Sequence, residues 1–335
     1  MRMIMGDVMG ITAEDSLIVL YDSRTPMEIP RVYSSVAADL GAEAAVVEIP
    51  RPPARKVFHL DLPKPIGAGL KSATKIIDSW ITYTPVLADA VEAGVHMLFI
   101  PPGPDSPEML VRAVGDVDMK KMEKEAARIA ELWTNEDEIT ITSNLGTDLK
   151  IDISGVKMPP TKYPPRTPKK GEKWMTFTPW GYTGGSVKNV EGTLVVNGRI
   201  GSSGIGLMWE AQQQPITLKI KDNRIVKADG GGSSLWPMFE NYLRKLGDPN
   251  VWGFPAHGPG IGLNPNARMG GPAEWERVRG CIVFGVGDNS VLRRFQADSL
   301  VGPAIKAPFH WDFQLFGVTL RIGDTAVIEN GEIKV

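Results

Sequence analysis

The hydrophobic and polar positions follow different patterns in the two halves of the chain. In the first half, short apolar runs alternate with stretches of helical spacing. The runs predict strands over 16–21, 43–49, 75–84 and 95–100, and the stretches predict helices over 26–40, 86–93 and 119–133. Strands that alternate with helices pair in parallel, and the helices cover the sheet. We therefore expect an α/β N-terminal domain with a largely parallel sheet.

Strand patterns dominate the second half. Strands over 138–143, 148–154 and 192–200 precede two hairpins, 215–221 with 224–228 and 325–329 with 332–335, and one helix is predicted over 233–246. Between the halves, Val156–Gly171 holds five prolines without apolar periodicity, which is typical of an extended connection. We expect an α/β domain over 1–155 and a β-rich α+β domain, with the metal-binding residues, over 156–335.

A run near the C-terminus, 306–316, carries candidate chemistry. If it is a strand, Phe309, Trp311, Phe313 and Leu315 lie on one face, and His310, Asp312 and Gln314 lie on the other. An imidazole and a carboxylate that point the same way can bind one metal ion, although a His-x-Asp is also commonly a hydrogen-bonded pair. His257, in the glycine- and proline-rich segment 254–260, is the candidate third ligand.

Composition narrows the function classes. The chain has 335 residues, 42% hydrophobic and 23% charged, as in ordinary soluble proteins. A net charge of -2, with no Lys/Arg cluster longer than two residues, argues against nucleic-acid binding. The lone cysteine, Cys281, is expected to fill the core. Without an internal disulfide, a signal peptide or a long apolar run, we expect a cytoplasmic protein with no membrane partner.

Two histidines and one carboxylate form the three-ligand face that holds Fe(II) in many oxygenases and leaves positions open. His310 and Asp312 follow His257 by 53 and 55 residues. The usual oxygenase order places His-x-Asp first, so the spacing alone leaves a structural pair and a metal site both open.

The layout also resembles the M29 aminopeptidase-like fold group. An α/β half is followed by Gly260–Ala267 and by His310-x-Asp312, which leads into a terminal hairpin. Where these peptidases have Pro-x-Gly-Glu-Val, this chain has Thr183–Val187, with Ser186 in place of a bridging carboxylate. The rest is similar to the iron-dependent 2,5-dihydroxypyridine 5,6-dioxygenase branch, which keeps one Fe(II) on a lone His and a later His-x-Asp.

This resemblance implies a non-haem Fe(II) extradiol-type dioxygenase that cleaves a hydroxylated aromatic, such as a dihydroxypyridine, with dioxygen. It implies Fe(II) on His257, His310 and Asp312. The candidate catalytic residues are His59, His96, Tyr182 and Ser186, and the candidate substrate contacts are Trp180, Asn264 and Arg268. His96 also fits a structural role in its apolar run, and Asn264 can cap a turn before Pro265.

Two other functions stay open at this stage. One is an M29-type metallo-aminopeptidase or hydrolase with two metal ions, and the other is a degenerate, non-catalytic relative. For assembly, we expect Trp174 and Trp180 to be exposed. Together with the small net charge, this predicts a homo-oligomer.

Overall fold

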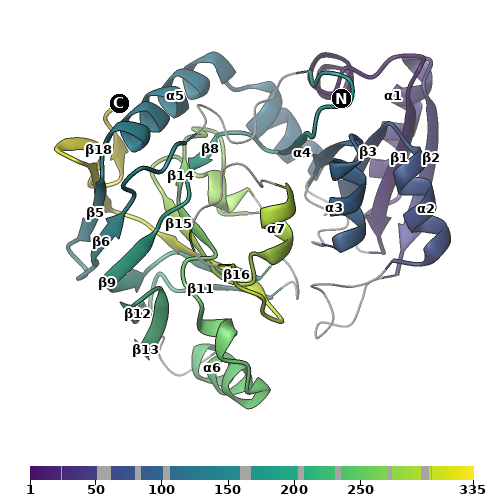
Figure 1. Cartoon of the computed structure of the whole chain (residues 1–335). Coiled ribbons are helices and arrows are strands. Elements are labelled where there is room, and N and C mark those ends of the chain that lie inside the picture. Colours follow the sequence, from purple (N-terminus) through teal and green to yellow (C-terminus); the bar gives the residue numbers. More distant parts are fainter. Residues whose placement is uncertain are drawn as a thin grey trace.

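The structure is a computed structural model, and it describes residues 1–23, 25–50, 62–79, 84–100, 106–158, 167–202, 207–230, 235–270, 274–295, 302 and 304–335. The described residues form one parallel and two antiparallel sheets. Figure 1 shows the parallel sheet with its helices on one side of the molecule and the antiparallel sheets on the other. The predicted fold class, an α/β first half followed by a β-rich second half, is confirmed.

The parallel sheet has the strand order β2-β1-β3-β4-β7. Its strands are β1 (Ser16–Asp22), β2 (Glu43–Ile49), β3 (Lys75–Ser79), β4 (His96–Phe99) and β7 (Met175–Phe177). Helix α1 (Glu28–Asp39) packs on one face, and α2 (Lys64–Ser72) and α3 (Pro85–Glu92) pack on the other. The sequence did not predict α2, because Gly67 and Gly69 interrupt its apolar pattern. The predicted third strand ends at Ser79, and residues 80–83 lie outside the described part.

Two antiparallel sheets make up the rest. The eight-stranded sheet has the order β13-β12-β9-β6-β5-β17-β18-β19, and the six-stranded sheet has the order β11-β10-β16-β15-β14-β8. The strands are β5 (Glu138–Ser143), β6 (Asp148–Asp152), β8 (Tyr182–Gly184), β9 (Asn189–Val196), β10 (Arg199–Ser202), β11 (Leu207–Glu210), β12 (Ile216–Lys221), β13 (Arg224–Gly230), β14 (His257–Gly262), β15 (Ile282–Gly287), β16 (His310–Leu315), β17 (Val318–Ile322), β18 (Thr325–Glu329) and β19 (Glu332–Ile333).

Further helical segments connect and cover these sheets. They are η1 (Met3–Val8), α4 (Ser106–Leu110), η3 (Val111–Gly115), α5 (Met119–Asn135), α6 (Leu235–Leu246), η4 (Pro249–Trp252), η5 (Trp275–Arg277) and α7 (Ser290–Phe295). Both predicted hairpins are confirmed. The single strand predicted over 192–200 is wrong, because the chain leaves β9 at Val196 and the Gly198 N–H donates to the Gln314 carbonyl of the other sheet.

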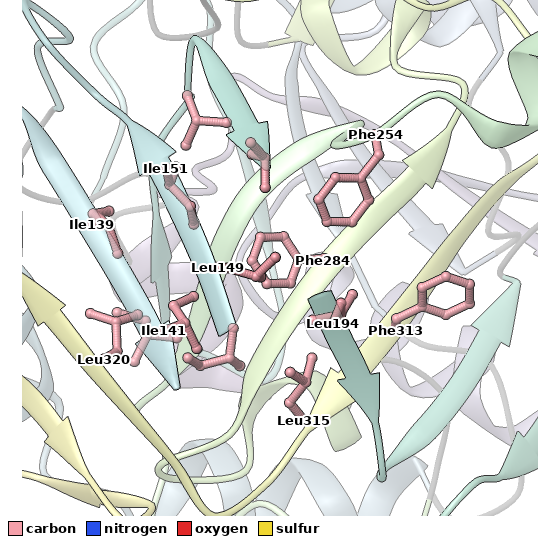
Figure 2. Packing of buried hydrophobic residues seen from close by; sticks show 14 of the residues in the cluster. Ile139, Ile141, Leu149, Ile151, Leu194, Phe254, Phe284, Phe313, Leu315 and Leu320 are labelled. Carbon is pink, nitrogen blue, oxygen red and sulfur yellow. The ribbon is translucent and has the colours of Figure 1, made fainter. Parts of the chain in front are cut away.

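The largest core lies between the two antiparallel sheets. Ile139, Ile141 and Leu149 enter it from the eight-stranded sheet, and Phe284 and Phe313 enter it from the six-stranded sheet (Figure 2). Burial of this apolar surface fixes the orientation of the six-stranded sheet. Its opposite face is therefore the one available for polar side chains.

The predicted boundary at 155/156 does not follow the sheets. Strands β5 and β6 precede it but join the later antiparallel sheet, whereas β7 follows it and pairs with β4. The division into two domains stays a prediction, and most of the proline-rich connection, 159–166, lies outside the described residues. Among the described residues, no helix has the length and apolar character of a membrane span.

The expectation that Trp174 and Trp180 are exposed is wrong. Their exposed fractions are 3% and 4%, because both pack into the core beside the parallel sheet. Exposed tryptophans therefore no longer argue for a homo-oligomer, which stays a prediction.

Candidate metal centre

Strand β16 has the two-faced character that its sequence predicts. Trp311, Phe313 and Leu315 are fully buried in the main core, and His310 and Asp312 lie on the opposite face. In the neighbouring strand β15, Gly285 pairs with Asp312 and Gly287 pairs with His310. A glycine thus lies beside each of these two polar side chains.

His257 joins them from the start of β14. It pairs with Gly285, so the same glycine lies between His257 on one side and Asp312 on the other. The His257 Nε2 lies 2.9 Å from the Asp312 Oδ1, and the His310 Nε2 lies 3.3 Å from that oxygen. Each residue of this triad offers one ligand atom, and the three atoms lie within 4.8 Å of one another.

Backbone carbonyls fix the orientation of both imidazole rings. The His257 Nδ1 lies 3.0 Å from the Gly258 carbonyl oxygen, and the His310 Nδ1 lies 2.6 Å from that of Asp288. A carbonyl oxygen only accepts, so each Nδ1 donates, and each Nε2 is left to face the Asp312 carboxylate. A metal-binding histidine is usually held in this way, with its second nitrogen donating to the protein.

The charges of the triad support one another. Burial alone would lower the pKa of His310, but the attraction of Asp312 outweighs it and raises this pKa above its usual range. Burial would raise the pKa of Asp312, but His310 and His257 outweigh it and hold this pKa well below the ordinary value. Asp312 is therefore an ionised carboxylate at neutral pH, the form that binds a cation.

Glycines surround the triad on the same face of the six-stranded sheet. The strand pairing places six of them there, namely Gly184, Gly201, Gly260, Gly262, Gly285 and Gly287. A Cβ at Gly285 would stand 2.4 Å from the His257 Cδ2 and 2.6 Å from its Nε2, closer than real contacts allow. We call this surface the glycine face.

Tyr182 is the candidate catalytic residue that the structure brings to the triad. Its ring lies over Gly260 and stands edge-on to the His257 ring, with 6.4 Å between the ring centroids. Ser186 is 2% exposed, and its carbonyl accepts a hydrogen bond from the Trp133 indole. This hydrogen bond from Trp133, which lies in α5, connects that helix to the backbone at Ser186.

Three further predicted residues, Asn264, Arg268 and His96, have other contacts. The fully buried Asn264 donates to the Ala113 and Trp180 carbonyls and accepts from the Asn266 N–H, so its amide holds the backbone together. Arg268 is at the surface, 3.7 Å from Glu108. His96 begins β4, at the opposite end from Phe99, and its Nδ1 contacts the Lys75 ammonium at 2.9 Å.

His59 lies outside the described residues, so its catalytic role stays a prediction. Cys281 is fully buried, and burial raises the pKa of its thiol to about 12. This inert thiol agrees with the expected role in the core.

Sequence reasoning missed two charged residues beside the triad. Glu276 and Arg277 form an ion pair in η5, and the Arg277 guanidinium lies 5.0 Å from the centre of the Tyr182 ring. In the sequence, a Glu followed by an Arg looks the same in a buried site as in an exposed turn, so the pair could not be singled out. The glycine face did have a signal, because 260 and 262, and again 285 and 287, repeat glycine with the period of a strand.

Comparison with known proteins decides the family. The family model for NicX, 2,5-dihydroxypyridine 5,6-dioxygenase, matches residues 7–335. The chain belongs to this dioxygenase family. A solved structure, the 2,5-dihydroxypyridine dioxygenase from Pseudomonas putida KT2440, aligns with a TM-score of 0.74 at 20% identity, covering 98% of this chain and 94% of that chain. At this identity the likeness shows a shared fold. No sequence among the curated proteins matches.

Proposed function

We propose that this member of the NicX family is an Fe(II)-dependent ring-cleaving dioxygenase that acts on a hydroxylated N-heteroaromatic compound such as a dihydroxypyridine. The observation that carries the proposal is the convergence of His257, His310 and Asp312 on one point, with both Nδ1 atoms bound to backbone carbonyls. Two imidazoles and one carboxylate suit Fe(II), and they leave coordination positions for substrate and dioxygen.

The donor set fits a divalent ion. Asp312 supplies a negative charge, each histidine presents Nε2, and Gly285 leaves the space between the two rings that a larger residue would fill. Bound Fe(II) would supply the electron transfer between an aromatic ring and dioxygen that ring cleavage requires.

The protein's own residues would bind and position the substrate ring. The triad side chains are 14%, 3% and 8% exposed for His257, His310 and Asp312, so the site is largely shielded from water. Shielding strengthens the electrostatic interactions of a bound anionic ring. Tyr182, half-buried at the edge of the His257 ring, supplies an aromatic surface and a hydroxyl close to this position.

The test is the iron content of ligand variants. His257→Ala, His310→Ala and Asp312→Ala are each expected to lose most of their iron while they keep the fold, because the main core lies on the other side of the sheet. Iron is measured by elemental analysis after anaerobic loading, and oxygen uptake is followed with a panel of hydroxypyridines and hydroxylated benzenes.

His96→Ala serves as the histidine control and is expected to retain its iron, because this ring contacts Lys75. If His310 and Asp312 formed only a structural pair, their variants would lose about 1–3 kcal/mol of stability without a change in metal content. Equal iron in the wild type and in His257→Ala would refute the proposal.

A further inference from the structure

A short helical segment covers the glycine face beside the triad. The Trp275 ring in η5 lies against Gly201, where a Cβ would stand 2.8 Å from its Cζ2. The Trp275 carbonyl accepts a hydrogen bond of 2.5 Å from the Gln314 amide, two residues beyond Asp312 on the same strand. The segment is therefore fixed to the strand that carries two of the three proposed ligands.

Arg277 anchors the other end of this segment. It is 3% exposed, and its guanidinium lies 5.0 Å from the centre of the Tyr182 ring and 5.9 Å from that of Phe177. Its Nε donates to the Pro179 carbonyl at 3.3 Å. These contacts hold one planar cation between the parallel sheet, which ends at Phe177, and the aromatic ring beside His257.

Glu276 lies between these two anchors. Its carboxylate pairs with Arg277, yet its side chain remains 22% exposed, more than any of the three proposed ligands. Its charge interacts with the charges of Asp312 and His310. A partly exposed acceptor thus stands beside the centre in a rigid setting.

We propose that Glu276 is a positioning residue that accepts a hydrogen bond from the ring N–H of an N-heteroaromatic substrate and so selects it over the carbocyclic analogue. This inference rests on the proposed function and names a determinant of its substrate class. The geometry suits the role because Arg277 pairs with the carboxylate while the Glu276 side chain stays 22% exposed. An acceptor that is held in place favours the ligand that carries the matching donor, because the analogue without that donor forms no hydrogen bond there.

The experiment compares two ligands in the iron-loaded protein without oxygen. The 2,5-dihydroxypyridine ring in its pyridone form has the N–H, whereas hydroquinone keeps two hydroxyls in para positions and lacks it. Equilibrium binding of both is measured for the wild type and for Glu276→Gln, with the iron content of each sample. The wild type is expected to bind the pyridine more tightly than hydroquinone. In Glu276→Gln the ratio of the two affinities is expected to fall about tenfold, since a charged acceptor is replaced by a neutral one.

Glu240→Gln is the matched control. Glu240 also pairs with an arginine, Arg244, and has an 18% exposed side chain, but it lies on α6 and away from the glycine face. It is expected to keep the wild-type preference. An equal loss of affinity for both ligands in Glu276→Gln, or no loss for either, overturns the role of Glu276 and leaves the iron site standing. A wild type that binds iron and does not bind the pyridine overturns both this role and the proposed substrate class.

Discussion

At the scale of single residues, the sequence was informative wherever a side chain follows from strand alternation. His310 and Asp312 were predicted on one face because Trp311 and Phe313 demand the other. Glu276 and Arg277 could not be predicted, because their position depends on how η5 folds back onto distant strands. Asn264 was predicted to contact the substrate, and the structure shows its buried amide bonded to backbone groups, so that role stays a prediction.

Replacement of one glycine tests how closely the proposed ligands must approach the sheet. Gly285→Ala places a methyl group 2.6 Å from the His257 Nε2, so the two rings must move apart. We expect iron affinity to fall by roughly 10- to 100-fold, as for other disturbances of the groups that orient ligands. Gly6→Ala is the control, because a Cβ there meets nothing within 4 Å. An unchanged affinity in Gly285→Ala, measured by competition with a chelator, would contradict the role of this glycine.

At the scale of helices and strands, periodic segments were predicted well and short ones were not. The predicted bounds of β2 match the structure, and those of α1, α3 and α5 differ by up to two residues. Strand β7, only Met175–Phe177, is too short for a periodic signal, and its position depends on pairing with β4. Through this strand the parallel sheet reaches Arg277, so the missed element connects the sheet to the surroundings of the site.

A buried cation connects strands β3 and β4 of the parallel sheet to the segment that follows η1. The Lys75 ammonium, at the start of β3, donates to the Met9 carbonyl at 2.9 Å and lies 2.9 Å from the His96 Nδ1. Lys75→Met leaves both acceptors without this donor, so we expect about 1–3 kcal/mol less stability in urea unfolding at pH 7. Lys71→Met, on the exposed side of α2, is the control and should stay within about 0.5 kcal/mol.

The pH dependence of the same variant has a definite sign. Burial lowers the pKa of Lys75 in the folded protein from 10.5. Between the lowered pKa and 10.5 the unfolded chain binds more protons, so this group makes the free energy of unfolding rise with pH. The stability difference between wild type and Lys75→Met should therefore widen as the pH is raised from 7 toward 10. A difference that narrows over this range would show that folding raises the pKa of Lys75 instead of lowering it.

At the scale of the whole molecule, the order of strands in the sheets argues against two independent halves. The sequence predicted most strands but could not show which ones pair, because pairing across long stretches of chain leaves no local pattern. Strands β5 and β6 pair with later strands, and β7 pairs with the earlier β4. Charged contacts add to this connection between the halves. Arg294 of α7 binds Asp89 and Glu92 of α3, and Arg112 of η3 binds Glu274 beside η5. The glycine face is thus held to the parallel sheet by both backbone and side chains.

Separate expression of 1–155 and 156–335 tests this connection. The first fragment keeps β5 and β6 without their partners β9 and β17, and the second keeps β7 without β4, so each would expose the edges of unfinished sheets. We expect neither fragment to melt cooperatively alone, and co-expression to restore a single transition near that of the intact chain, followed by circular dichroism. Two fragments that each melt cooperatively would mean that the halves fold independently. The strand pairs between them would then form only after each half has folded.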